Sequence, residues 1–115
     1  MNNNEVLNKL KELKDVSRNL YIQLEEDGLK VSDPQAGLAK EQFFQNNIKN
    51  IVNAIEGLMR GEASERHMVR LDKEFPNAKE NLGKLKSAPV GMKNGSTLNQ
   101  VEGLVNYLES KYREL

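Results

Sequence analysis

Apolar residues recur at alternating spacings of three and four along four stretches of the chain. This spacing places apolar side chains on one face of an α-helix, the face that packs against other helices. In chain order the stripes are Val6, Leu10, Leu13, Leu20, Leu24; Phe44, Ile48, Ile51, Ile55, Leu58; Met68, Leu71, Phe75, Ala78, Leu82, Leu85; and Leu98, Val101, Val105, Leu108, Tyr112, Leu115. The pattern predicts four amphipathic helices and an all-α fold.

The first stripe is interrupted at Ser17, which occupies a position of the apolar spacing. We interpret this serine as a small residue where two helices approach closely, with the neighbouring Val16 able to take its place. Further apolar residues lie beside the stripes: Leu7, Phe43, Val52, Met59 and Leu104. They either widen the apolar faces to form a closed four-helix core or make a second surface that binds a partner.

Capping residues and glycines mark the first helix and its exit. We expect this helix to begin at Asn3 or Asn4 and to end at Asp27. Gly28 then supplies the left-handed residue that commonly stops a helix. Residues 29–33 are predicted to be a loop.

The second helix has a clear start and a clear stop. Asp33 followed by Pro34 combines a capping carboxylate with proline at the first helical position. The helix is predicted to run to Arg60, with Gly61 as its stop.

The third helix is expected to begin at a Ser64 cap, and Pro76 lies inside its stripe. Proline removes a backbone hydrogen bond, so we predict a helix that is kinked or broken near Pro76. The stripe keeps its phase from Phe75 to Ala78, which favours a kink or a restart on the same axis.

Residues 87–96 contain Pro89, Gly91 and Gly95 and are predicted to be the longest loop. Thr97 with Gln100 three residues later is a capping-box signature for the fourth helix. Short connections make sequential helices antiparallel neighbours. We therefore expect a single domain over residues 1–115, a four-helix bundle with up-down-up-down topology.

Composition narrows the function classes. The 115 residues are 37% hydrophobic and 30% charged, with 17 basic and 17 acidic residues. This balance lacks the basic excess typical of nucleic-acid binders. No apolar run approaches the roughly 20 residues that span a bilayer, and residues 1–5 show no secretory signal. We expect a cytoplasmic protein with no membrane span.

Chemistry-bearing residues are sparse. The chain has no cysteine and one histidine, and its carboxylates and His67 lack the Glu-x-x-His spacing of di-iron bundles. We therefore expect no enzymatic activity, no catalytic residues, no cofactor and no metal site.

A helical protein without catalytic groups most often acts by binding another protein. We expect a small adaptor, regulator, chaperone or assembly subunit that binds a helical partner through apolar helix faces, with self-association as a further possibility. The candidate contact residues are the aromatics beside the stripes, namely Tyr21, Phe43 and Tyr107, because aromatic side chains are enriched at binding hot spots.

Two alternatives remain open. His67 on a predicted helix resembles the histidine of a phosphotransfer domain, a four-helix bundle of similar size, but Arg70 and Leu71 stand where that family has lysine and glycine. The size and the predicted architecture are also similar to those of bacteriocin immunity proteins. The first alternative implies phosphorylation of His67, and the second implies protection of a cell against a toxin.

Overall fold

The computed structural model describes residues 3–29 and 33–115. Over these residues the chain forms helices and turns and no strand. The elements are α1 (Asn3–Glu26), α3 (Pro34–Glu41), the π-helix η1 (Gln42–Ile48), α4 (Lys49–Met59), α5 (Ser64–Ser87), α6 (Pro89–Lys93), α7 (Gly95–Lys111) and the 3₁₀ turn η2 (Tyr112–Glu114). The predicted all-α class is confirmed.

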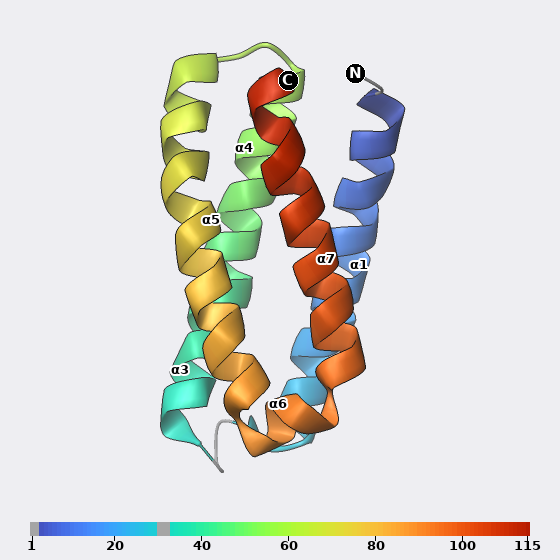
Figure 1. Ribbon diagram of the computed structural model, residues 1–115, viewed down its shortest axis with the longest axis vertical. Helices are drawn as coiled ribbons and strands as arrows, with labels where there is room; N and C mark the ends of the chain where they lie inside the picture. Colours follow the sequence, from blue (N-terminus) through green and yellow to red (C-terminus); the bar gives the residue numbers. More distant parts are fainter. Residues whose placement is uncertain (1–2, 30–32) are drawn as a thin grey trace.

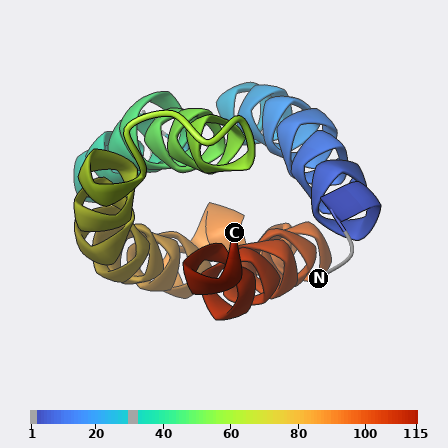
Figure 2. The same cartoon turned by 90° about the horizontal axis from the view of Figure 1, so that it is seen from above.

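The long helical segments pack side by side as a helical bundle of about 43 × 23 × 18 Å (Figure 1). Seen from above, α1, α4, α5 and α7 surround a common centre (Figure 2). Contacts are dense between α4 and α5 and between α1 and α7, and sparse between α1 and α4. Both chain ends lie at one end of the bundle.

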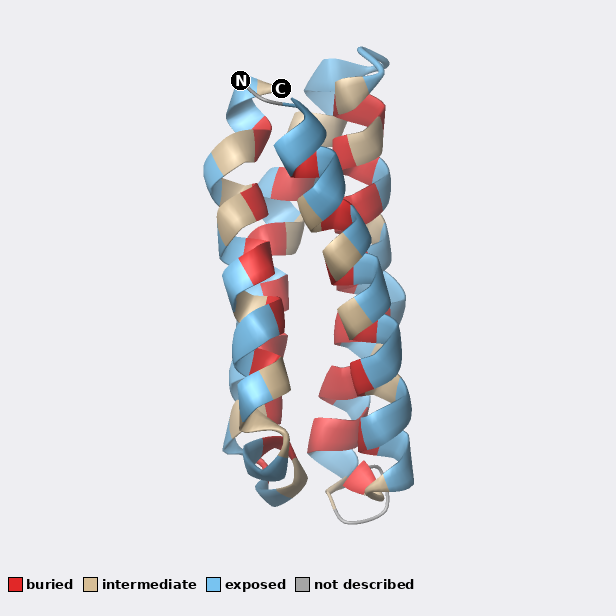
Figure 3. Ribbon diagram, turned by 90° about the vertical axis from the view of Figure 1, so that its right-hand side faces the viewer, coloured by how far each residue is buried: buried red, intermediate tan, exposed pale blue. Residues whose placement is uncertain are grey.

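The predicted stripes form the core. Buried positions face the interior and exposed positions face outward along every long helix (Figure 3). All stripe residues are buried except Met68 and Leu115, which are partly buried and pack against the same core. Of the residues beside the stripes, Phe43, Val52 and Leu104 complete the core, whereas Leu7 is 49% exposed.

Two predicted features of the connection after α1 are confirmed, namely the glycine that ends α1 and the aspartate that caps α3. Gly28 has a positive φ of 77°, the conformation glycine adopts without steric cost. Asp33 caps α3, because its Oδ1 accepts hydrogen bonds of 3.1 Å from the backbone N–H groups of Gln35 and Ala36. Leu29 is helical and buried rather than part of a loop, and residues 30–32 of the predicted loop lie outside the described residues.

The second predicted helix is interrupted by η1. A π-turn inserts one residue into an α-helix, and here it allows the consecutive Phe43 and Phe44 both to be buried. The segment ends as predicted, with Arg60 as C-cap and Gly61 at φ 73°.

Two features of the third helix differ from alternatives that the sequence left open. The helix is continuous from Ser64 to Ser87, so the break at Pro76 is wrong, whereas the favoured kink stays a prediction. Phe75 and Ala78 on either side of the proline are both buried, and this packing holds the helix together despite the missing hydrogen bond. Ser64 is not the cap, because the N-cap residue is Ala63 at φ 45° with no side-chain hydrogen bond.

The predicted loop at 87–96 is also wrong in part, because residues 89–93 form the short helix α6. It packs directly onto the end of α5: a Cβ on Gly91 would lie 1.5 Å from the carbonyl oxygen of Leu85. Helix α7 begins at Gly95 with Asn94 as N-cap, so Thr97 and Gln100 lie inside the helix and form no capping box.

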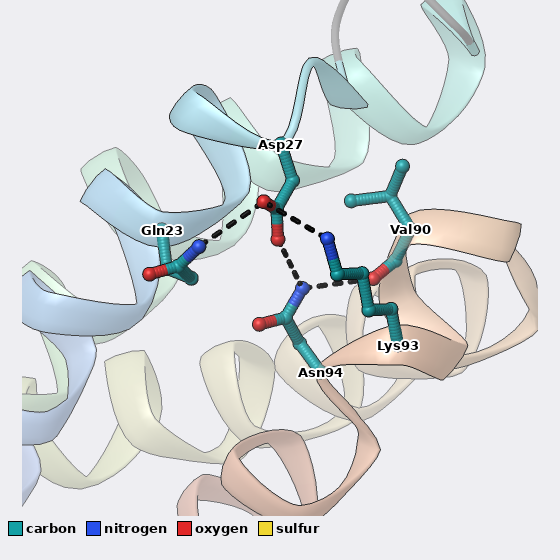
Figure 4. A network of polar contacts seen from close by, with 5 residues as sticks. All are labelled: Gln23, Asp27, Val90, Lys93 and Asn94. Atoms are coloured by element: carbon teal, nitrogen blue, oxygen red, sulfur yellow. Dashed lines mark hydrogen bonds and ion pairs between the residues drawn. The ribbon is translucent and has the colours of Figure 1, made fainter.

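A polar network joins the end of α1 to the α6–α7 junction (Figure 4). Asn94 Nδ2 donates to Asp27 Oδ2 at 3.0 Å and to the Val90 carbonyl at 2.9 Å. Gln23 Nε2 donates to Asp27 Oδ1 at 3.1 Å, and Lys93 Nζ lies 3.5 Å from the same oxygen. The hydrogen bond from Asn94, supported by those from Gln23 and Lys93, lowers the pKa of Asp27.

Candidate functional site

A groove of about 450 Å³ runs between α1 and the η1–α4 segment. Its lining combines apolar side chains with polar and basic ones. The lining residues are Lys14, Ser17, Arg18, Tyr21 and Ile22 from α1, and Phe44, Gln45, Ile48, Lys49, Val52 and Asn53 from η1 and α4. Ile22 is 50% exposed at the edge of the groove.

The groove lies where the first stripe carries Ser17. The other stripe positions of α1 hold leucine or valine, which fill the space between helices. Ser17 is buried but too small to fill it, and its Oγ has no hydrogen-bond partner. We predicted a close approach of helices at this serine, and the structure instead places a hollow beside it.

A buried lysine anchors the Tyr21 end of the groove. Lys40 is completely buried, with Nζ 2.6 Å from Glu25 Oε1 and 3.4 Å from Glu41 Oε1. Neither contact has hydrogen-bond angles, so the ammonium is held by charge rather than by directed bonds. The same nitrogen lies 4.4 Å from the centroid of the Tyr21 ring, a favourable cation–π distance.

Tyr21 is fixed from both of its ends. Its hydroxyl donates a 2.9 Å hydrogen bond to Glu41 Oε1, and its ring packs edge-to-face on Phe44. The hydrogen bond to Glu41, followed by burial, raises the pKa of Tyr21 to about 12. The phenol is therefore neutral at physiological pH and acts as a rigid hydrogen-bonding wall of the groove.

The other side of η1 borders a second, polar groove of about 310 Å³. The nearly buried Asn81 donates from Nδ2 to Asn47 Oδ1 at 2.8 Å. Glu74 Oε2 accepts from Asn47 and Asn50 at 3.4 and 3.3 Å. These amides satisfy one another, so this groove has a structural explanation: it fixes α5 against η1.

The three aromatic residues predicted to contact a partner have different positions. Tyr21 lines the groove, whereas Phe43 is completely buried and offers no surface to a partner in this conformation. Tyr107 is partly buried on α7, with the Nζ atoms of Lys9 and Lys111 5.8 and 5.9 Å from its ring centroid. The structure does not bring Tyr107 and Tyr21 into one site.

His67 packs against α4. A Cβ on Gly57 would lie 2.2 Å from His67 Nε2, so the ring occupies space that only a glycine leaves free. Leu71, one turn later, is completely buried. In this conformation the Nε2 atom faces Gly57 and is not presented to an approaching receiver domain.

Among the described residues, no group of three or more histidine, cysteine, aspartate or glutamate side chains is arranged to hold a metal ion. None of the helices in the described ranges is long and apolar enough to cross a bilayer. No protein-family model, curated protein or solved structure matches this chain.

Two features of this site were not predicted from the sequence. Ser17 was the available signal for the hollow, since it is the one polar residue in the spacing of the first stripe. Lys40 gave no signal, because a lysine next to Glu41 is typical of an exposed helix face.

Proposed function

We propose that the protein is a non-enzymatic interaction module that binds a helical segment of another protein in the groove between α1 and η1–α4. The observation that carries the proposal is the groove itself: an apolar floor of Phe44, Ile48 and Val52 that remains open beside Ser17. A groove between two helices accepts the apolar face of a third by the same spacing that builds a bundle.

The proposal includes the topology. We take α1, the α3–η1–α4 segment, α5 and α7 as the four members of an up-down-up-down bundle, supported by the two chain ends lying at one end of the molecule. The groove then separates the first and second members, and a bound helix adds to the bundle from outside.

The chemistry of the lining supports binding rather than catalysis. The described lining residues include no carboxylate and no imidazole, and the Tyr21 phenol has a pKa of about 12. A general acid or base needs a pKa near the working pH, so this groove is suited to recognition.

Ser17→Leu tests the proposal, because leucine restores the apolar stripe and fills the hollow. Helical peptides selected by display on the wild-type protein are expected to bind with micromolar affinity and to lose at least about tenfold on Ser17→Leu. Ser17→Ala removes the hydroxyl without filling the groove and is expected to retain binding.

Ser110→Leu, the same substitution at an exposed position of α7, is the control for added hydrophobicity. Failure of every selected peptide to bind the folded wild-type protein, or equal binding to Ser17→Leu, would refute the proposal.

A further inference from the structure

The edges of the groove are basic on both sides. Lys14 and Arg18 line it from α1, and Lys49 lines it from α4, with no acidic residue among the described lining residues. The whole chain has equal numbers of acidic and basic residues. The charged side chains that line the groove are therefore all positive, and they surround an apolar floor.

These cations remain available to a partner. Lys14 lies 3.0 Å from Glu56, with side-chain exposures of 48% and 33%, and Arg18 lies 3.2 Å from Asp15 in an exposed pair. Lys49 makes no ion pair among the described residues. Exposed pairs contribute little to stability, so a partner carboxylate can replace Glu56 or Asp15 at small cost.

From this charge pattern we infer that the occupant of the groove is an amphipathic helix whose apolar stripe is flanked on both sides by glutamate or aspartate. The inference rests on the proposed function and names the class of partner. The apolar stripe covers Phe44 and Ile48, and its flanking carboxylates face Arg18 on one side and Lys49 on the other. Glu25 and Glu41 lie beyond Tyr21, where Lys40 offsets one of their two negative charges. The acidic flanks of the partner therefore match the Lys14–Arg18 part of the groove, away from these two carboxylates.

Three designed helical peptides test the inference. They share one apolar stripe and carry glutamate, glutamine or lysine at the flanking positions, and their affinities are measured by fluorescence anisotropy at low and high salt. The acidic peptide is expected to bind about tenfold more tightly than the neutral one, with the basic peptide weakest. This preference shrinks at 1 M salt, where the screening length is about 3 Å.

Lys49→Glu is expected to abolish the preference for the acidic peptide, whereas Lys73→Glu makes the same charge change on the exposed face of α5 and leaves it intact. Equal binding of the three peptides, preference for the basic one, or an acidic peptide that binds Lys49→Glu undiminished would overturn the inference and leave the proposed function standing. Binding of none of the three, together with failure of the display selection, overturns the proposed function itself. The wild-type chain could instead self-associate, and Ser17→Leu could remove that self-association. This result would assign the groove to a second copy of the chain and would also overturn the inference.

Discussion

At the scale of single residues, Lys40 is the most unusual feature of the molecule. A completely buried ammonium is costly unless it is paired, and Lys40 has Glu25, Glu41 and the Tyr21 ring around it. The two carboxylates reach solvent, so the cluster joins the core to the surface. It positions Tyr21, the aromatic wall of the groove, relative to α3.

Replacing the buried cation with an apolar residue should cost less stability than removing one of the carboxylates that compensate it. Lys40→Met replaces the cation with an apolar side chain of similar length and is expected to change the free energy of unfolding by less than about 1 kcal/mol. Glu25→Gln leaves the cation underpaired and is expected to cost about 1–2 kcal/mol, discounted for the exposure of Glu25. Urea denaturation of both variants measures the difference. Equal losses would show that the pair contributes no charge compensation.

The raised pKa of Tyr21 predicts a loss of stability at alkaline pH. The phenol ionises at about 10 in the unfolded chain and at about 12 in the folded one. Its stabilising contribution is therefore complete below pH 10 and is lost as the pH rises through 12. Absorbance titration of the phenolate in wild type and Tyr21→Phe isolates this step. If the ionisation step that is present in wild type and absent from Tyr21→Phe lies at pH 10, the hydrogen bond from Tyr21 to Glu41 is not maintained in solution.

Gly91 is required by a close approach of backbones. The Cβ of an alanine at this position would overlap the Leu85 carbonyl oxygen, so Gly91→Ala is expected to lower the free energy of unfolding by about 2 kcal/mol or more. Gly103→Ala is the matched control, since it lies inside α7 with no atom within 4 Å of the added Cβ. It is expected to stabilise by about 0.5–1 kcal/mol. Similar thermal melts for the two variants would contradict the packing of α6 on α5.

At the scale of elements, two helices depart from regular α geometry in different ways. The π-helix η1 lies between the apolar groove and the polar groove. Residues on one face of η1 line the apolar groove, and residues on the other face line the polar groove. Helix α5 instead tolerates Pro76 without interruption. The first departure shapes the candidate site, whereas the second is a local cost compensated by the packing of Phe75 and Ala78.

That local cost can be removed. Pro76 has no N–H to donate to the Asp72 carbonyl, so Pro76→Ala restores one helical hydrogen bond and is expected to stabilise the protein by about 1–3 kcal/mol. Lys73→Ala, at another exposed position of α5, is expected to be nearly neutral. Chemical denaturation followed by circular dichroism measures both. A destabilised Pro76→Ala would show that the proline geometry itself is needed for packing.

At the scale of the whole molecule, all four apolar stripes are buried within one chain. The remaining exposed large apolar side chains, such as Leu38 and Met92, are distributed over different helices. The groove between α1 and η1–α4 is an apolar depression that folding leaves open beside Ser17, and it is bordered by basic residues.

This closure predicts a monomer. Light scattering is expected to give the mass of one chain, 13.0 kDa, at all concentrations, and circular dichroism a single cooperative thermal transition. A mass that rises with concentration, or a helical signal that melts gradually, would show that a stripe is open and shared with another chain.

The helical stripes, the exit at Gly28, the Asp33 cap and the stop at Gly61 were determined by the sequence, because spacing and capping depend on residues within a few positions of one another. The hollow at Ser17, the burial of Lys40, the π-turn and the helical form of residues 89–93 were decided only by the tertiary structure. Each depends on the space and charge that distant segments supply. A serine leaves a groove only when no neighbouring helix fills it. Lys40 can be buried only where Glu25 of α1 joins its chain neighbour Glu41 in compensating the charge.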